Sequence, residues 1–542
     1  MTKTVASLVT ETLIEAGFNQ LYCLPGVQND DFFDALYDRQ TELAPIHTRH
    51  EQGAAYMALG AYLATGKPQV FSVVPGPGFL NSCAALSTAY SLNAPLLALI
   101  GQIPSGAIGK GFGLLHEIPD QMGILKGLTK FASRITSGDD AASVLSNALS
   151  QLQGGRPRPI GIEVPVNIWK ATVPSLGNQV NVTPTIGASV AQDKIEQAAD
   201  LLRQSKRPLI VVGSGAQANS ELVTRLAERL NAPVIAFRTG HGVISGSHPL
   251  CVGTPVGHEL WRTTDTVIGL GTRLQTQQMQ WGVDKDLQII HIDIDAAEIG
   301  RINAPAIGIN ADIRHALPCL LDALSTNKTD RTDWLEHVAT TKVRFQALYE
   351  EKLAPQLSWL KAIRNELSDD GILVDELTQV GYVSRFAYPV HHPRTFLSTG
   401  YQGTLGWGIA TALGAAHARR DVPVVSIAGD GGALFNIAEL ATAAHHQIPL
   451  VSIIFNDNAF GNVRRFQIEN YNNRPIASNL SSPDFVRLAE SFGVRGLQAN
   501  SPTELQKQLT HAFKSDGPTV IEVPVGEFPS PWEFILMPKV RG

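Results

Sequence analysis

The stretch Val424-Val425-Ser426-Ile427-Ala428-Gly429-Asp430-Gly431-Gly432 joins a short apolar run to a glycine-rich turn that carries one acidic residue. Such a run predicts a buried strand, and the glycines after it predict a turn that opens a helix. Backbone N–H groups at a helix start attract phosphate, whereas an aspartate placed among them repels it. A cation resolves this conflict, because Asp430 then binds the metal and the metal binds the phosphate oxygens. Since oxygen ligands suit Mg²⁺, the turn predicts a diphosphate–magnesium site.

A second metal ligand is expected at the end of the next strand. The segment Phe455-Asn456-Asp457-Asn458-Ala459 occupies that place, and Asp457 follows Asp430 by 27 positions (457 − 430 = 27). One helix and one strand fill this gap, so both aspartates are expected at the carboxyl edge of one sheet, where α/β folds bind ligands. A Gly-Asp-Gly turn alone also fits a plain turn, and it is the pair at this spacing that predicts the site.

The segment around this turn has a counterpart near the N-terminus. Ala58-Leu59-Gly60-Ala61 recurs as Ala412-Leu413-Gly414-Ala415 (412 − 58 = 354), and the same offset relates Ser72 to Ser426 and Pro95 to Pro449. Two unrelated α/β segments could share such a rhythm. A constant offset over about forty residues favours two copies of one domain.

Both copies alternate apolar strands with helices, which predicts parallel sheets covered on both faces. The middle third also shows α/β alternation, with strands expected at 208–212, 267–270 and 288–294. The chain is therefore predicted to be an α/β protein of three doubly wound parallel-sheet domains, the first and last related. The predicted boundaries are 1–171, 189–323 and 356–542, with polar linkers near 172–188 and 324–334.

The bulk composition excludes several classes of protein. The 542 residues are 44% hydrophobic and 17% charged with a net charge of −6, which fits an ordinary globular protein and not a nucleic-acid binder. The four cysteines lie far apart, and no apolar run approaches the length of about 20 residues that spans a bilayer. The N-terminus reads as an amphipathic helix and not as a signal peptide. We expect a cytoplasmic protein.

The whole chain resembles the thiamine-diphosphate (ThDP) enzymes of the acetolactate synthase, benzoylformate decarboxylase and pyruvate oxidase superfamily. In that family the metal motif begins with Gly-Asp-Gly and ends in Asn-Asn or Asn-Asp. The resemblance implies that Asp430, Asp457 and the backbone carbonyl of Ala459 bind Mg²⁺. It also implies that the first and last domains bind the pyrimidine and the diphosphate of the cofactor.

The run Arg49-His50-Glu51-Gln52-Gly53-Ala54-Ala55 resembles the family's signature around its essential acid. A carboxylate in this place stabilises the proton on N1′ of the cofactor's aminopyrimidine, so that the 4′-imino group can remove the C2 proton. Glu51 is the predicted catalytic acid. The alternative is a surface glutamate, against which the close-packed apolar helix after it argues.

The segment Gly403-Thr404-Leu405-Gly406 resembles the part that bends the cofactor. The resemblance implies that the carbonyl of Gly403 and the N–H of Leu405 bind the pyrimidine. It further implies a site between subunits of a homodimer or homotetramer. We assign the diphosphate loop to Val380-Gly381, where Tyr382 and Val383 replace the family's polar side chains.

The central domain holds FAD or ADP in some members of the family. Gly213-Ser214-Gly215 and Gly271-Thr272-Arg273 resemble parts of that site. An empty, vestigial domain is an equally good interpretation.

Substrate is expected against the turn that contains Val27 and Gln28, and against the loop before Pro119. That loop carries His116 where acetolactate synthases have Gln in a Phe-Gln-Glu run, and Gln121 follows it. His116 is a candidate for a proton donor or an anchor of a substrate carboxylate, and a packing or capping histidine is the alternative. His445 and His446 are interpreted as surface residues.

The predicted activity is a ThDP- and Mg²⁺-dependent lyase or carboligase acting on a 2-oxo acid or a related carbonyl compound, by decarboxylation, carbon–carbon bond formation or both. Two alternatives stay open. One is a flavin-dependent 2-oxo acid oxidase of the same fold, and the other is a non-catalytic ThDP-binding regulatory protein. The retained acids Glu51, Asp430 and Asp457 argue against the latter.

Overall fold

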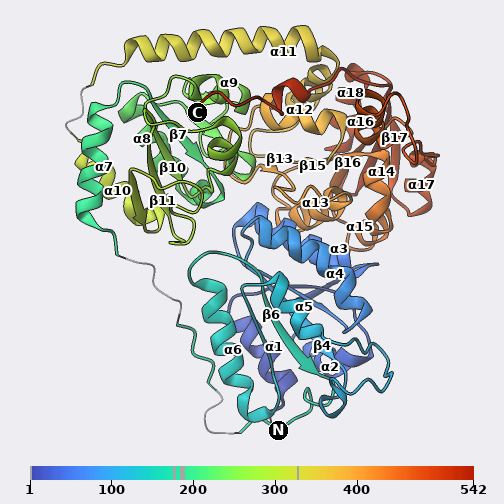
Figure 1. Cartoon of the computed structure of the whole chain (residues 1–542). Helices are drawn as coiled ribbons and strands as arrows, with labels where there is room; N and C mark the ends of the chain where they lie inside the picture. The colour runs from blue at the N-terminus through green and yellow to red at the C-terminus, as the bar shows by residue number, and fades with distance from the viewer. Residues whose placement is uncertain (1–2, 175–178, 184–188, 326–328) are drawn as a thin grey trace.

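The computed structural model describes residues 3–174, 179–183, 189–325 and 329–542. Three parallel sheets of six strands each follow one another along the chain, each with helices on its faces (Figure 1). This arrangement confirms the predicted α/β class and the three doubly wound domains. Parts of the two predicted linkers lie outside the described residues, namely 175–178 and 184–188 of the linker 172–188, and 326–328 of the linker 324–334.

The first domain is built on a sheet with the strand order β2-β1-β3-β4-β6-β5. Its apolar strands are buried and its helices cover both faces, as the long runs of Val, Ile and Leu predict. The strands are β1 (Gln20–Cys23), β2 (Ala44–His47), β3 (Gln69–Val73), β4 (Leu96–Gln102), β5 (Phe131–Arg134) and β6 (Ile160–Pro165), and the helices are α1 (Val5–Glu15), α2 (Asp30–Tyr37), α3 (Glu51–Thr65), α4 (Pro77–Ser91), α5 (Gln121–Leu128) and α6 (Gly138–Gln153).

The last domain has the order β14-β13-β15-β16-β18-β17, which repeats the first strand for strand. This match confirms the duplication predicted from the sequence. Its strands are β13 (Ile372–Val374), β14 (Phe396–Leu397), β15 (Val424–Gly429), β16 (Leu450–Asn456), β17 (Arg495–Gln498) and β18 (Thr519–Pro524), and its helices are α12 (Gln379–Ala387), α13 (Trp407–Ala418), α14 (Asp430–Ala433), α15 (Leu440–His445), α16 (Gly461–Asn470), α17 (Phe485–Ser491) and α18 (Pro502–Ala512).

The central domain has the order β12-β11-β10-β7-β8-β9. The long helix α11 (Thr332–Glu366) leads from it to the last domain and bends at Leu353, two residues before Pro355. Its strands are β7 (Pro208–Val212), β8 (Val234–Ala236), β9 (Cys251–Val252), β10 (Thr266–Leu270), β11 (Gln288–Asp293) and β12 (Ile307–Asn310), and its helices are α7 (Gln192–Gln204), α8 (Ser220–Leu230), α9 (Thr254–Trp261) and α10 (Ile313–Ala323).

The first and last domains meet where α3 crosses α13, in the middle of one shared hydrophobic core. A Cβ atom on Gly60 would lie 1.8 Å from the carbonyl oxygen of Thr411, and one on Gly414 would lie 1.9 Å from that of Met57. Only glycine allows so close an approach of two helix backbones. These two glycines belong to the repeated Ala-Leu-Gly-Ala motif, so the motif marks the joint between the two copies.

Within the described residues, no helix is long and apolar enough to cross a membrane.

Candidate active site

A cavity of about 310 Å³ opens where β15 and β16 end in the last domain. The turn after β15 and the loop after β16 form two of its walls, and the segment before α13 forms a third. Predicted residues among its lining are Gly403, Leu405, Gly429, Asp430, Gly431, Gly432, Asp457 and Ala459. The structure thus brings the predicted diphosphate, metal and pyrimidine segments of this domain together.

The two aspartates lie at the bottom of this cavity. The side chain of Asp430 is buried; its Oδ2 accepts a hydrogen bond from Ser482 Oγ at 2.6 Å, while its Oδ1 has no hydrogen-bond partner among the described residues. Burial, and then the neighbouring carboxylate of Asp430, raise the pKa of Asp457 to about 6. Two crowded carboxylates with a free buried oxygen form a donor set that fits a divalent cation.

The loop after β16 is held by polar contacts at both ends. Asn456 Nδ2 donates to Glu522 Oε1 at 2.8 Å, and Asn458 adopts a positive φ of 52°, which asparagine tolerates. The backbone N–H of Phe460 donates to the carbonyl of Ser478 at 2.8 Å. These contacts hold the backbone of Ala459 beside Asp457.

The diphosphate loop differs from the prediction. Val380 and Gly381 are buried inside α12 and do not line the cavity, because the helix begins at Gln379. The residues of this segment that line the cavity are Leu377, Thr378 and Gln379, directly before Val380, and Tyr382 within the helix. Gln379 Nε2 donates to Asp457 Oδ2 at 2.8 Å, so this missed residue also orients a predicted metal ligand.

A buried carboxyl group supports the pyrimidine segment from behind. Glu376 is fully buried and its Oε1 accepts a hydrogen bond from the N–H of Gly406, which follows Leu405. Burial raises the pKa of Glu376 to about 7, although the N–H groups of Gly406 and Gly408 counteract the shift. The sequence showed no sign of this role, because Glu376 lies 30 positions before its partner.

Glu51 begins α3 at one edge of the first domain and is half-buried. Its Oε2 accepts a hydrogen bond from Asn81 Nδ2 at 3.0 Å. A Cβ atom on Gly78 would lie 3.3 Å from Glu51 Oε1 and 2.7 Å from a methyl group of Val74. Glycine at position 78 therefore leaves room for the carboxylate beside the start of α4.

His116 and Gln28 meet at the same edge. His116 Nδ1 lies 3.1 Å from Gln28 Oε1, and Gln28 Nε2 lies 3.4 Å from the carbonyl oxygen of Leu115. Because the amide oxygen only accepts, Nδ1 carries the proton in the neutral ring and Nε2 is left as an acceptor. The backbone of His116 has a positive φ of 67° and lies against Gly76, whose Cβ would sit 2.4 Å from the His116 carbonyl oxygen.

Gln121 has a different place from the one predicted. Its side chain is buried, and its Oε1 accepts from the N–H of Gly76 at 2.8 Å. Its Nε2 donates to the carbonyl of Gly101 at 3.0 Å and to Glu163 at 2.7 Å. Every hydrogen-bonding group of the amide is used inside the domain, so Gln121 positions the turn beneath His116 and has none left for a substrate. Val27, by contrast, is exposed.

The two halves of the predicted site do not meet within one chain. The cavity over Asp430 is lined only by residues of the last domain, as far as the described residues show. Glu51, Gln28 and His116 lie on the edge of the first domain and contribute nothing to it. In one chain, the predicted acid half (Glu51, Gln28 and His116) therefore lies apart from the predicted diphosphate half around Asp430.

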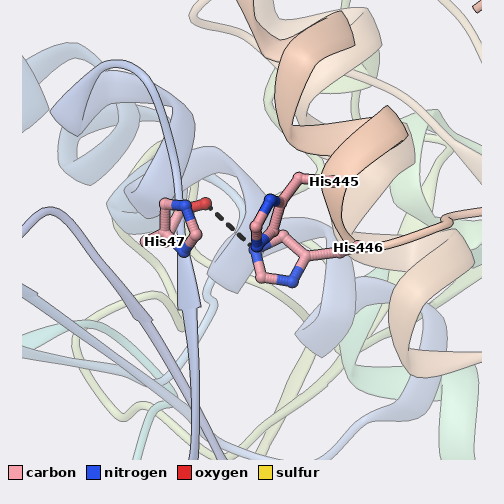
Figure 2. Close-up of side chains that lie close together, drawn as sticks. All are labelled: His47, His445 and His446. Atoms are coloured by element: carbon pink, nitrogen blue, oxygen red, sulfur yellow. Dashed lines mark hydrogen bonds between the residues drawn. The ribbon is translucent and has the colours of Figure 1, made fainter. Parts of the chain in front are cut away.

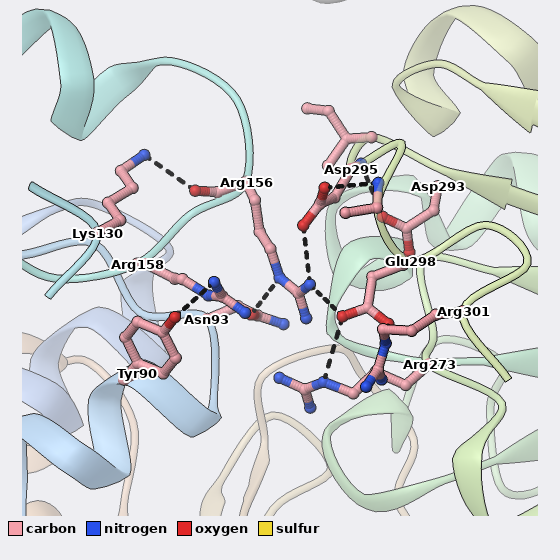
Figure 3. A network of polar contacts seen from close by, with 12 residues as sticks. Tyr90, Asn93, Lys130, Arg156, Arg158, Arg273, Asp293, Asp295, Glu298 and Arg301 are labelled. Carbon is pink, nitrogen blue, oxygen red and sulfur yellow. Dashed lines mark hydrogen bonds and ion pairs between the residues drawn. The ribbon is translucent and has the colours of Figure 1, made fainter. Parts of the chain in front are cut away.

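A second cavity, of about 390 Å³, lies where the central domain meets the other two. Figure 3 shows Arg156 between Asp295 and Glu298, with Arg273 and Arg301 also turned toward Glu298. Arg238 lines the same cavity, and in the described part of the chain it has no carboxylate partner. Burial, and then the charge of Arg273, lower the pKa of Arg238 to about 10.

The glycines predicted for a nucleotide site line this second cavity, and they also serve the fold. A Cβ atom on Gly213 would lie 2.5 Å from the carbonyl oxygen of Gly271. One on Gly215 would lie 2.8 Å from the Cα of Gly271. The close contact of the two turns explains these glycines without a ligand. The surplus of arginines needs a different explanation.

Comparison with known proteins agrees with this geometry. Residues 3–124 match the family "Thiamine pyrophosphate enzyme, N-terminal TPP binding domain", residues 195–320 match its "central domain", and residues 378–523 match its "C-terminal TPP binding domain". Relatives include a probable acetolactate synthase large subunit of Methanocaldococcus jannaschii, 32% identical over 96% of this chain and 91% of its own. Others are a probable 2-ketoarginine decarboxylase of Pseudomonas aeruginosa (29% identical; 96% of this chain, 94% of its own) and the acetolactate synthase isozyme 1 large subunit of Escherichia coli (29%; 96% and 93%).

Proposed function

The chain belongs to the thiamine pyrophosphate enzymes and is a ThDP-dependent enzyme of the carboligase or decarboxylase type. From this premise we propose that it acts on a 2-oxo acid, with Mg²⁺–ThDP held by Asp430, Asp457 and the carbonyl of Ala459. The observation that carries the metal assignment is the buried Oδ1 of Asp430, which has no hydrogen-bond partner among the described residues. A divalent cation would supply the missing partner.

The chain's own residues divide the work around the cofactor. ThDP, when bound, would supply a nucleophilic carbon that adds to the carbonyl carbon of the substrate. The N–H groups at the start of α14 would bind the diphosphate, and Gly403 and Leu405 would hold the pyrimidine. Glu51 holds the proton on the pyrimidine ring nitrogen, and His116 faces the substrate. These roles follow from the family resemblance together with the placement of each residue.

We infer that the site is completed by a second copy of the chain. The acid half of one chain would cover the diphosphate half of its partner, and each chain would serve two sites. Exposed large apolar side chains accompany both halves, as expected of surfaces that become buried. Beside the acid half these are Val27, Leu80, Phe112 and Leu115, and beside the diphosphate half they are Phe435, Val463 and Ile476.

The substrate class can be tested directly. Purified protein with ThDP and Mg²⁺ is to be offered a panel of 2-oxo acids, including pyruvate and a 2-oxo acid with a cationic side chain, with CO₂ release and carbon–carbon coupling measured in parallel. We expect ThDP-dependent CO₂ release from at least one of them. Consumption of none of them would contradict the assignment to 2-oxo acids and direct attention to acyl-CoA substrates.

Among the predicted substrate residues, His116 is the one whose replacement is expected to lower turnover most. Since it lies on the substrate side, His116→Ala should leave ThDP binding and exchange of the cofactor's C2 hydrogen nearly unchanged. Turnover should fall by about 10²–10⁴-fold if the imidazole transfers a proton.

The matched variant His116→Asn separates chemistry from packing. Asparagine tolerates the positive φ of this position, so the loop keeps its shape while the imidazole is removed. Both variants should be slow with an unchanged melting temperature. A destabilised protein with normal turnover per folded molecule would show that His116 only packs, and Gln28 would become the candidate.

We further propose that the second cavity binds an anionic nucleotide, either FAD or ADP. The support is the half-buried guanidinium of Arg238, which has no carboxylate partner among the described residues, in a cleft lined by three more arginines. Arg238→Ala should weaken nucleotide binding by about 10–100-fold, as expected for loss of a charge-assisted hydrogen bond. Calorimetry with ADP and with FAD measures the effect, and Arg314→Ala, an exposed arginine of α10 paired with Asp312, is the control.

The two ligands have different consequences. A yellow protein that releases flavin on denaturation would favour the flavin-dependent oxidase, whereas bound ADP without flavin would leave the lyase or carboligase assignment intact. Equal binding by wild type, Arg238→Ala and Arg314→Ala would contradict the proposed site. Binding of neither nucleotide by the wild type would indicate a vestigial domain.

A cytoplasmic location is proposed from the cysteines. Cys23, Cys83, Cys251 and Cys319 are all free thiols, as is usual in a reducing compartment.

A further inference from the structure

Three histidines from the two ends of the chain gather on the side of the first domain that faces the last. Figure 2 shows His47, at the end of β2, opposite His445 and His446, at the end of α15. One ring nitrogen of each residue lies within 4.8 Å of the other two. The ring centroids are 4.6, 5.0 and 4.8 Å apart and the rings meet edge to face, so they do not form a stack.

The end of α15 explains how two consecutive residues reach one partner. Successive side chains on a helix point in different directions. Here the helix ends at His445, and His446 is already the capping residue, so the backbone turns and both rings approach His47. His446 Nε2 lies 3.2 Å from the carbonyl oxygen of His47, to which it donates. The sequence interpretation of His445 and His446 as plain surface residues therefore misses their shared contact.

Burial affects the pKa values of two of the three rings. Burial, and then the neighbouring His47, His445 and Arg49, lower the pKa of His446 to about 4, although its bond to the His47 carbonyl acts in the opposite direction. Burial, His445 and Arg49 likewise lower the pKa of His47.

No carboxylate belongs to the cluster in the described residues. The acid on this side of the last domain, Glu439, accepts hydrogen bonds from the N–H groups of Arg49 and His50 at 3.1 and 3.0 Å. A set of nitrogen ligands without carboxylates favours Zn²⁺ and its transition-metal neighbours and disfavours Mg²⁺ and Ca²⁺.

We propose that His47, His445 and His446 form a binding site for Zn²⁺ or a similar borderline divalent cation, joining the first and last domains of the chain. Three imidazoles and a water molecule complete a tetrahedral shell with Zn–N distances of about 2.0–2.1 Å. The nitrogens must then approach to about 3.4 Å from one another, and the exposed side chain of His445 has the freedom to move. His446 Nε2 exchanges its bond to the carbonyl for the bond to the metal.

The position of this site couples it to the acid half of the active site. His47 ends β2 four residues before Glu51, and the backbone of the connecting residues is already held by Glu439. A bound cation ties the same segment to α15 through side chains as well. The site is independent of the carboxylate site over Asp430, which uses oxygen ligands in another part of the last domain.

The test is a calorimetric titration of Zn²⁺ into the holoenzyme with Mg²⁺ and ThDP at saturation, so that the carboxylate site is filled. We expect one Zn²⁺ bound per chain. His445→Ala should weaken this binding by at least about tenfold, since loss of a direct ligand exceeds the usual effect of losing a supporting residue. His511→Ala is the matched control, because His511 is also exposed and also lies in the last turn of a helix of the same domain.

Two further measurements make the result decisive. Because ligands that bind only the folded state stabilise it, Zn²⁺ should raise the melting temperature of the wild type and of His511→Ala but not of His445→Ala. His47→Gln should lose the same binding, which shows that the first domain contributes a ligand. Equal Zn²⁺ binding by wild type and His445→Ala, or no Zn²⁺ bound by the wild type, would overturn the proposal.

Discussion

Replacing Asp430 with alanine is expected to abolish the metal-dependent retention of ThDP. The variant removes a buried carboxylate whose Oδ1 has no hydrogen-bond partner in the described residues and whose Oδ2 is held by Ser482. Without it the cation loses its ligand at the helix start, and the diphosphate loses its bridge to the protein. The affinity for ThDP in Mg²⁺ should fall by more than about 100-fold, measured by calorimetry, because direct ligands contribute more than supporting residues.

Two further variants distinguish the effect of losing the charge from the effect of losing structure. Asp430→Asn keeps the shape and the bond to Ser482 within reach, yet it lacks the charge, so it should lose nearly as much affinity. Asp516→Ala removes an exposed aspartate from a surface turn of the same domain and should bind normally. Tight Mg²⁺-dependent binding by Asp430→Ala would contradict the metal assignment.

Replacing Glu51 with glutamine should slow exchange of the C2 hydrogen of bound ThDP by about 10²–10⁴-fold, the range typical of a lost acid–base group. Glutamine keeps the hydrogen bond to Asn81 within reach but cannot stabilise a protonated ring nitrogen. ThDP affinity should fall much less. Hydrogen–deuterium exchange at C2, followed by NMR after rapid quenching, measures the rate, and Glu336→Gln on the exposed face of α11 is the control.

Mixing the two inactive variants tests whether the site is shared. If Glu51 of one chain serves the cavity of its partner, a mixed dimer of Glu51→Gln and Asp430→Ala contains one site with both defects and one with none. Random pairing should then restore about a quarter of the wild-type turnover. A mixture that stays inactive after confirmed subunit exchange would place both residues in a single-chain site.

The parts of the site that depend on nearby residues could be predicted from the sequence. Strand, turn and helix around Asp430 lie within a few positions, and the spacing to Asp457 follows from one helix and one strand. The repeated Ala-Leu-Gly-Ala motif predicted two related domains, which the matching strand orders confirm.

The parts of the site that the sequence did not predict depend on contacts between residues far apart in the chain. The helix α12 already begins at Gln379, so Gln379 reaches the cavity and Val380, which was predicted to do so, does not. Gln121 was predicted to contact the substrate, but in the fold its amide donates hydrogen bonds to Gly101 and Glu163. His47 lies 399 positions before His446, and no local pattern connects it to the consecutive pair His445 and His446.

The close approach of α3 and α13, at Gly60 against Thr411 and at Gly414 against Met57, fixes the two outer domains to each other. Because backbone meets backbone there, no side chain can repack to absorb a shift, and a displacement of α13 is passed to α3. Leu405 lies just before α13, and Glu51 is the first residue of α3. In the proposed dimer these two residues of one chain serve different sites. A displacement of α13 on cofactor binding at one site would therefore also move Glu51 at the other site.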